Sequence, residues 1–499
     1  MSRNLITLEH NNQRDTSNID HLLQDHTRLG RLAKRYSGGA HINSRVHERV
    51  RDDLLALRDF CEDRHRRIFN LRQRTNNFIT LLYNLITGHD STVNLRIATQ
   101  SASIAREARK DSEARNRADA AGFYRFALPQ VYGGQSHPDT NLWMSAIRYH
   151  LTSHPVYGGG LGLANDLQNE HSIVGNFPDV LMLHHFGNED QRKTLIPARL
   201  QGTFRTTFGL TEPDHGSDAT YMSTTARQTR GGFEITGAKK WQTGAHHCTH
   251  FLIFARTSGQ PGSAQGITAF LVPRDTAGLR IASYEWTLNM PTDHATVVLN
   301  QVWVPESAVL GSVDQGLAIA QTFVHENRIR QAASSCGAAR YCLDRSIERA
   351  RSRKIWGEGK TLADNQAIQF PVVELMTQVE MLRLFIFKTG WEMDRVVAEC
   401  QASGKRPWVE IERRLSDQVA MCNFWANRLC CQAADRAIQI HGGDGYSRHY
   451  PFEHIYRHFR RYRITEGAEE IQMRKIGAYI FGFAGPKKDT AAQQSKAKI

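Results

Sequence analysis

Residues 206–311 carry a short-strand pattern enclosed on both sides by helical patterns, and this order restricts the possible folds more than any other feature. Runs of β-branched and aromatic residues alternate there with turns of Gly, Pro and Ser, which is typical of β structure. The clearest runs are Phe251–Ala255, Gly266–Val272 and Thr296–Val304, and residues 231–237 read as a turn that enters a strand. We therefore predict a small β domain in this part of the chain.

The residues on either side follow helical spacing. Residues 113–205 look helical but are interrupted at Leu128–Gln130 and at the glycine run 158–160. Beyond Gly316, long helical patterns cover residues 317–349, 363–400, 409–441 and 467–482. Antiparallel helices of this length pack most simply as a bundle. We therefore predict a helical domain over 113–205, a β domain over 206–311 and a helical bundle over 312–484.

The composition narrows the possible partners. Hydrophobic residues make up 40% of the chain and charged residues 23%, as in ordinary globular proteins. No uninterrupted apolar run approaches the ~20 residues that a membrane helix needs. The net charge of +13 comes without zinc-finger spacing or a glycine-rich RNA motif. We therefore expect no membrane span and no nucleic-acid partner, because a basic surface suits an anionic small molecule equally well.

The eight cysteines show no spacing typical of a metal site. Cys430 and Cys431 are adjacent within a helical pattern, so their side chains point apart. The simplest interpretation is a reduced, intracellular protein without a bound metal.

Three motifs place polar and glycine residues in patterns suited to ligand binding. The first is 208–218, Phe-Gly-Leu-Thr-Glu-Pro-Asp-His-Gly-Ser-Asp, and the second is 239–245, Lys-Lys-Trp-Gln-Thr-Gly-Ala. The third joins 439–446, Gln-Ile-His-Gly-Gly-Asp-Gly-Tyr, to 463–472, Arg-Ile-Thr-Glu-Gly-Ala-Glu-Glu-Ile-Gln. Each has a plain structural alternative: a polar turn, a core aromatic residue, a helix stop, or acidic residues in the first turn of a helix. Their order and spacing favour the functional interpretation.

Together the motifs resemble the acyl-CoA dehydrogenase family over residues 118–482. The resemblance implies a mainly α fold with a β-barrel middle domain, between an N-terminal helical domain and a C-terminal four-helix bundle. It implies FAD as cofactor and flavin-dependent α,β-dehydrogenation of an acyl-CoA thioester to a trans-2-enoyl-CoA. Glu466 matches the catalytic glutamate of the family, which takes the α-proton of the thioester. A glutamate here, rather than an aspartate, favours a dehydrogenase over the related nitroalkane oxidases.

The resemblance also implies binding residues. Thr211 and Thr243 would hydrogen-bond the flavin ring, and Trp241 would pack on its face. The implied flavin contacts are Phe208, Thr211, Trp241, Thr243, Arg353, Trp356, Gln366, Gln439, Gly442, Gly443, Ala468 and Glu470. The implied substrate contacts are Ser217, Arg328 and Gly467, and no metal is implied.

The same resemblance implies partners. In the family, one set of residues binds the FAD of a neighbouring subunit. In this chain the matching positions are Arg353, Trp356, Gln366, Gln439 and Gly442–Gly443. We therefore expect a homodimer or a homotetramer. The electron acceptor is either an electron-transfer flavoprotein or oxygen, as in oxidases. A third interpretation, from another class, is a helical interaction protein with an inactive dehydrogenase body.

Several residues depart from the family pattern. Gln242 stands where an apolar residue is common, and Thr465 replaces the usual tyrosine before the glutamate. Ala468 and Glu470 replace a threonine and a glutamine, and His325 also differs from other members. The fold prediction is unaffected, but chain length and branching of the acyl group stay open.

The two ends of the chain need separate interpretations. Residues 1–112 are polar, basic and helical in pattern, and they resemble the soluble stalk of fungal CorA-like magnesium transporters without the membrane helices. We interpret them as a fusion near Ser112–Glu113 that leaves the 113–205 domain truncated.

Residues 485–499 read as a disordered tail ending in Ala497-Lys498-Ile499, which is similar to a peroxisomal signal. A mitochondrial or cytoplasmic location is the alternative.

Overall fold

A computed structural model of the chain describes residues 116–154, 175, 177–288, 294–322 and 324–483. The chain divides into two units, Met1–Arg109 and Lys110–Ile499, and every described residue belongs to the second. The predictions of a stalk-like extension in 1–112 and of a tail with a targeting signal in 485–499 therefore lie outside the described residues.

The strands form one mixed sheet. They are β1 (Thr206–Gly209), β2 (Thr225–Thr229), β3 (Gly232–Thr243), β4 (His250–Arg256), β5 (Ile267–Pro273), β6 (Leu279–Glu285), β7 (His294–Pro305) and β8 (Val309–Leu310). Their order is β6-β7-β3-β2-β4-β5-β8, with β1 parallel to β4 beside this path. Along β4 and β5 nearly every residue is buried, because these strands are covered on both faces. On β7, by contrast, buried and more exposed residues largely alternate.

The sheet is open, so the prediction of a closed barrel is corrected. Its path ends at β6 on one side and β8 on the other, and these two strands do not pair with each other. Its two halves meet where β2 runs parallel to β4 through the single residue pair Thr225 and Arg256. The strand-like runs in the sequence indicate β structure, but closure depends on which edges pair, and that is a long-range property.

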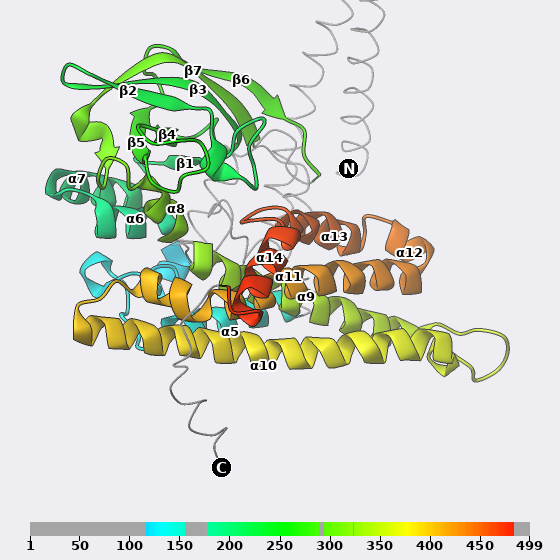
Figure 1. Cartoon of the computed structure of the whole chain (residues 1–499). Coiled ribbons are helices and arrows are strands. Elements are labelled where there is room, and N and C mark those ends of the chain that lie inside the picture. The colour runs from blue at the N-terminus through cyan, green and yellow to red at the C-terminus, as the bar shows by residue number, and fades with distance from the viewer. Residues whose placement is uncertain (1–115, 155–174, 176, 289–293, 323, 484–499) are drawn as a thin grey trace, which may run out of the picture. The chain divides into compact units, whose positions relative to one another are not determined.

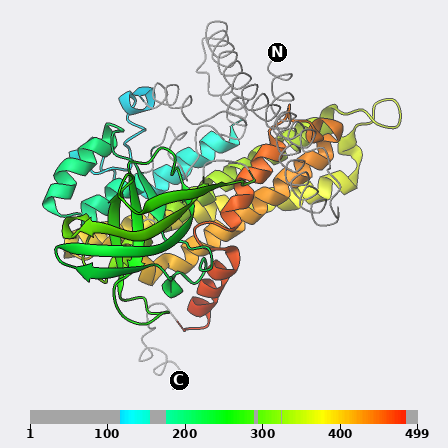
Figure 2. The same cartoon turned by 90° about the horizontal axis from the view of Figure 1, so that it is seen from above.

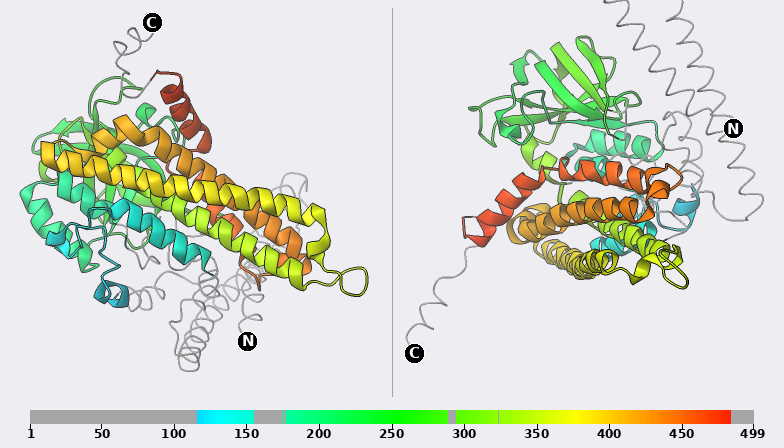
Figure 3. Two further views of the ribbon diagram at one scale, coloured as in Figure 1. Left: turned by 90° about the horizontal axis from the view of Figure 1, so that it is seen from below. Right: turned by 90° about the vertical axis from the view of Figure 1, so that its right-hand side faces the viewer.

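The helices form a bundle on one side of the sheet (Figures 1 and 3). The long helices are α5 (Thr140–Ser153), α9 (Val324–Ser352), α10 (Gln366–Ser403) and α11 (Pro407–His441). The shorter ones are α6 (Pro178–Phe186), α7 (Glu189–Leu200), α8 (Gly316–Thr322), α12 (Gly443–Tyr446), α13 (Phe452–Arg460) and α14 (Glu469–Ile480). Helices α5, α9, α10 and α11 pack together, and α13 and α14 pack on α11. Figure 2 shows α9, α10 and α11 running side by side.

The four long helical patterns read from the sequence agree with the structure within a few residues. They correspond to α8 with α9, to α10, to α11 and to α14. The predicted strands correspond to β3, β4, β5 and β7, whereas β1, β2, β6, β8, α12 and α13 were not predicted individually. The missed elements are mostly short, so each holds too few residues to show a period.

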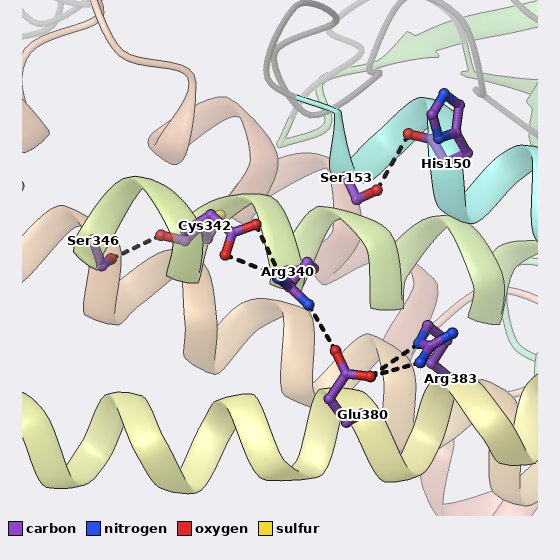
Figure 4. A network of polar contacts seen from close by, with 8 residues as sticks. His150, Ser153, Arg340, Cys342, Ser346, Glu380 and Arg383 are labelled. Atoms are coloured by element: carbon purple, nitrogen blue, oxygen red, sulfur yellow. Dashed lines mark hydrogen bonds and ion pairs between the residues drawn. The ribbon is translucent and has the colours of Figure 1, made fainter. Parts of the chain in front are cut away.

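Polar contacts join the helices of the bundle to one another. Arg340 on α9 pairs with Glu380 on α10 at 2.6 Å, and Glu380 also pairs with Arg383 at 2.8 Å (Figure 4). At the start of α5, the carboxylate of Asp394 on α10 accepts hydrogen bonds from the backbone N–H groups of Asn141 and Leu142 at 2.9 and 3.0 Å. Asp394 therefore caps a helix that lies far from it in sequence. No helix within the described ranges has the length and apolar character to cross a membrane.

Candidate active site

Two segments that are distant in sequence meet where β1 ends. The carbonyl of Thr211 accepts a hydrogen bond from the N–H of Lys240 on β3 at 2.9 Å. Next to this contact, Lys239 Nζ and Glu212 Oε1 form an ion pair of 2.8 Å, and their side chains are 0% and 4% exposed. Glu212 also accepts hydrogen bonds from two backbone N–H groups just before β2. The pair thus fixes the first two sequence motifs against each other.

Burial and pairing act in opposite directions on this ion pair. Burial lowers the pKa of Lys239 to about 8 even though Glu212 favours the charged amine. Burial alone would raise the pKa of Glu212, but the charge of Lys239 and the hydrogen bonds bring it below its usual value. Both groups are charged at neutral pH, so each depends on the other for compensation.

Trp241 and Thr243 follow directly on β3. Trp241 has a left-handed backbone, with φ of 64°, and its side chain is 47% exposed. The hydroxyl of Thr243 lies 2.9 Å from Nδ1 of His294, its register partner on β7. Burial lowers the pKa of His294 to about 4, so this ring is neutral near pH 7. The indole ring and the threonine hydroxyl are therefore both fixed at the same strand end.

These residues fit FAD. A half-exposed indole offers a flat apolar face to an isoalloxazine ring, and the Thr243 hydroxyl can make a hydrogen bond beyond the one with His294. The side-chain amide of Gln242 is buried, and neither its oxygen nor its nitrogen has a partner among the described residues. Buried polar groups of this kind usually contact a ligand or water. Bound there, FAD would supply the acceptor for a hydride.

Glu466 lies on the turn that precedes α14. Its backbone is left-handed, with φ of 58°, and Gly467 follows with φ of 90°. The residue is half-buried, and the side chain of Asn327 donates a hydrogen bond to its carboxyl group. Burial raises the pKa of Glu466 to about 7, although the charge of Arg328 and the hydrogen bond from Asn327 lower it. A carboxyl group with this pKa is suited to remove a proton near neutral pH.

Arg328 holds this turn by its backbone. Its Nε and Nη2 donate to the carbonyl oxygen of Glu466 at 3.0 and 2.5 Å. Only 7% of Arg328 is exposed. A Cβ atom added at Gly467 would approach Arg328 Nη2 to 2.9 Å, so glycine leaves the room that this contact needs. The predicted contact of Arg328 with substrate stays a prediction.

A second group of predicted flavin residues lies at one end of the bundle. These are Arg353 and Trp356 in the loop between α9 and α10, Gln366 at the start of α10, and Gln439, Gly442 and Gly443 where α11 meets α12. Arg349 pairs with Asp444 at 2.8 Å, which joins the end of α9 to α12. Trp356 is 83% exposed, and the loop lies away from the strands (Figures 1 and 3). Within one chain, this group does not come together with Trp241.

The remaining predicted residues are spread around the two centres. Phe208 is half-buried on β1 and packs on Phe254, with ring centroids 5.0 Å apart. Ser217 is exposed in the loop after β1. Ala468 is the N-cap of α14 and Glu470 is exposed in its first turn. Their roles toward flavin and substrate stay predictions.

Sequence reasoning missed the residues that support Glu466 and Thr243. Asn327 contacts the Glu466 carboxyl, and His294 contacts Thr243. Gln472 donates to the carbonyl of Gly467, and Asn423 donates to the backbone carbonyl of Arg328. Gln472 is the last residue of the third motif but had no role assigned to it, and each of the others is a single polar residue within a helix or strand that none of the three motifs includes. The one available signal was the presence of amides at positions that the helical period assigns to the buried face.

Comparisons with known proteins agree with this geometry. Sequence models of the acyl-CoA dehydrogenase middle domain and C-terminal domain match residues 207–302 and 314–481. A probable acyl-CoA dehydrogenase of Bacillus subtilis, YngJ, is 32% identical over 352 residues, which span 70% of this chain and 85% of the relative. The chain belongs to the acyl-CoA dehydrogenase family. The prediction of a flavin-dependent acyl-CoA dehydrogenase with FAD as cofactor is thereby confirmed.

Other family members extend the comparison. The caffeyl-CoA reductase–Etf complex subunit CarC of Acetobacterium woodii is 30% identical over 72% of this chain and 87% of the relative. The fold is similar to that of a glutaryl-coenzyme A dehydrogenase in complex with glutaryl-CoA, with a TM-score of 0.61, 25% identity and coverage of 78% of this chain and 94% of that one. An acyl-CoA dehydrogenase complexed with FAD from Bacillus anthracis gives a TM-score of 0.65 at 22% identity, over 82% of this chain and 68% of that one.

Proposed function

We propose that Glu466 is the base of this enzyme and that it removes the α-proton of an acyl-CoA thioester. Bound FAD would supply the acceptor for the hydride that leaves the β-carbon, so the product would be a trans-2-enoyl-CoA. The observation that carries the proposal is the Glu466 carboxyl itself, which is contacted by Asn327 and has a pKa raised to about 7 by burial. It is therefore basic enough to accept a proton yet largely ionised just above neutral pH.

The thioester oxygen also needs hydrogen-bond donors, because negative charge develops on it when the α-proton leaves. A donor at such a position is worth roughly 3–4 kcal/mol. The backbone N–H of Glu466 is the donor that the resemblance implies. The turn that carries this N–H has a fixed left-handed conformation at Glu466 and Gly467. The same turn therefore positions both the base and the oxyanion donor.

Anaerobic mixing of the FAD-loaded protein with a panel of acyl-CoA thioesters tests this proposal. We expect bleaching of the flavin absorbance with the correct acyl group. Glu466→Gln keeps the shape of the side chain but cannot accept the proton, so it should retain flavin and lose bleaching by about 10³-fold or more.

Glu189→Gln is the matched control, because Glu189 is an exposed glutamate on α7 that forms a surface ion pair with Lys193. It should bleach at the wild-type rate. Normal bleaching by Glu466→Gln would refute the assignment of the base. A preparation that stays colourless after FAD addition would instead favour the inactive interaction protein.

We further propose an electron-transfer flavoprotein as the electron acceptor. One relative, CarC of Acetobacterium woodii, is a subunit of a caffeyl-CoA reductase–Etf complex. Hydrogen peroxide release during turnover in air would favour the oxygen-using alternative.

Because CarC and another relative are named as reductases, the assay should also be run in reverse, with a reduced carrier and an enoyl-CoA or arylacryloyl-CoA.

We also propose that FAD binding is completed by a second copy of the chain, in a homodimer or homotetramer. The support is the separation of the exposed group around Trp356 from Trp241 within one chain. Helix α10 adds an exposed apolar stripe, with Phe370, Val373, Met381 and Leu384 each at least 60% exposed. Apolar stripes of this kind on a helix commonly mark an interface.

A further inference from the structure

The turn that carries Glu466 is held by hydrogen bonds to three of its carbonyl groups. Asn427 Nδ2 donates to Tyr462 O at 3.1 Å, Arg328 to Glu466 O, and Gln472 Nε2 to Gly467 O at 2.7 Å. The turn needs such support, because a left-handed conformation at a non-glycine residue costs roughly 1–3 kcal/mol and Glu466 has φ of 58°. The donors come from α9, α11 and α14.

One buried amide connects all three donors. Asn423 on α11 is 0% exposed. Its Oδ1 accepts hydrogen bonds from Asn427 Nδ2 at 3.2 Å and from Gln472 Nε2 at 3.1 Å. Its Nδ2 donates to the backbone carbonyl of Arg328 at 2.9 Å and to Gln331 Oε1 at 3.3 Å. Both donors and both acceptor positions of this amide are therefore used.

This use of all four positions makes the side chain hard to replace. Aspartate at 423 would direct a second oxygen at two acceptors, the Arg328 carbonyl and Gln331 Oε1. Leucine would remove the hydrogen-bond partner that these two acceptors share with the donors Asn427 Nδ2 and Gln472 Nε2. Asn427 is itself fixed, because its Oδ1 accepts from Ser335 on α9 at 2.6 Å. The network is buried on all sides, which makes each hydrogen bond more sensitive to loss.

We propose that Asn423 is a positioning residue for the base: it aligns Gln472, Asn427 and the backbone of Arg328 so that the turn presents Glu466 in one fixed conformation. Asn423 touches neither substrate nor flavin in this role. The inference rests on the proposed function of Glu466. It predicts that loss of the Asn423 amide changes how Glu466 works and not only how well the protein folds.

The test compares Asn423→Asp and Asn423→Leu with a matched control, Gln191→Leu. Gln191 is a buried amide on α7 that donates to the carbonyls of Ser307 and Val309, both at 2.9 Å, well outside the catalytic turn in sequence. The readouts are the melting temperature, the substrate concentration at half-saturation, the limiting rate of flavin bleaching, and the pH dependence of that rate. A misplaced catalytic group commonly costs 10–100-fold in rate, so we expect a loss of about that size in both Asn423 variants.

The pattern of changes separates positioning from structure. In the Asn423 variants, the limiting rate of flavin bleaching should fall while the substrate concentration at half-saturation stays nearly unchanged. The midpoint of the pH–rate curve should also move, because Glu466 no longer keeps its contacts with Asn327 and Arg328. Gln191→Leu should lower the melting temperature and leave the rate and the pH midpoint as in wild type. If the Asn423 variants behave like Gln191→Leu, the inference is wrong and Asn423 is only part of the core.

Two further measurements protect the test. Gln472→Met removes the donor to Gly467 O with little change in side-chain volume. This variant tests the positioning role even if the Asn423 variants do not fold. Enzyme whose flavin has been reduced beforehand cannot accept a hydride, but Glu466 can still exchange the α-proton of acyl-CoA with D2O, and Gln472→Met should slow this exchange about tenfold. Absence of bleaching and of exchange in wild type would refute the proposed function, whereas wild-type exchange in Gln472→Met would refute only the positioning role.

Discussion

At Glu466, burial and two neighbouring groups set the pKa of one carboxyl. Burial disfavours the charged form, while the guanidinium of Arg328 and the amide of Asn327 favour it, and the balance raises the pKa to about 7. Arg328 contributes twice, since it also holds the Glu466 carbonyl. Such a carboxyl takes up a proton near neutral pH because its buried surroundings disfavour the ionised form. The ionised form therefore lowers the stability of the folded protein.

This cost predicts a pH-dependent stability. Glu466 ionises near 4.5 in the unfolded chain and near 7 in the folded one, so between these pH values the folded state holds a proton that the unfolded state releases. Stability therefore falls as pH rises through this window and levels above it. Glu466→Gln removes the effect, and we expect it to be more stable than wild type by up to about 3 kcal/mol at pH 8.

Urea unfolding of both proteins at pH 4.5 and pH 8 measures this difference. The gain of the variant should shrink toward zero at the lower pH. An equal difference at both pH values would show that Glu466 does not titrate between them in the folded state.

Among the elements, the junction of β1 with β3 depends most on a single interaction. The ends of these strands carry Thr211, Trp241 and Thr243, and the buried pair of Glu212 and Lys239 lies next to them. A buried charge without its partner is costly, whereas a buried ion pair is often no better than an apolar pair. The junction thus tolerates replacement of both partners better than replacement of one.

Glu212→Gln should therefore destabilise the protein by about 3–5 kcal/mol, because Lys239 stays buried without a carboxylate. The double variant Glu212→Gln with Lys239→Met should recover much of that loss. Urea unfolding measures the stability, and the ratio of flavin to protein absorbance reports whether the Trp241 region still binds FAD. A double variant that is no more stable than the single one would contradict a paired role.

For the whole molecule, the proposed assembly of two or four chains rests on how the candidate site is arranged. The group around Trp356 and the group around Trp241 are separate, while the stripe of apolar residues on α10 is exposed. A charge at the centre of an apolar interface lacks a partner there and weakens association. The stripe therefore offers a direct way to separate assembly from folding.

We expect Met381→Glu with Leu384→Lys to reduce the mass of the assembly in analytical ultracentrifugation and to lower FAD retention. The two changes carry opposite charges, so the net charge of the chain is kept. Val131→Lys, on a residue that is 76% exposed outside the long helices, is the control. A wild-type protein that is monomeric and fully loaded with FAD would contradict the proposed assembly.

Local spacing alone was sufficient to predict the long helices and the central strands. Helices α10 and α11 bury residues at the helical period, α9 buries an unbroken run from Asn327 to Ala339, and β4 and β5 are nearly continuous apolar runs. The family motifs also marked Glu466, Trp241 and Thr243 as candidates. Such features repeat within a few residues, so they can be read from neighbouring positions in the chain.

Only the tertiary structure decided how these residues are arranged and supported. The sheet is open and not a closed barrel, because closure depends on which distant edges pair. The pKa of Glu466 depends on Arg328 and Asn327, and Gln472, which donates to the carbonyl of Gly467, is itself bonded to Asn423. Those residues lie on α9, α11 and α14, far apart along the chain, and a single buried amide shows no local pattern. The sequence determined which elements form and which residue is the candidate base, whereas packing between distant helices determined the ionisation and orientation of that base.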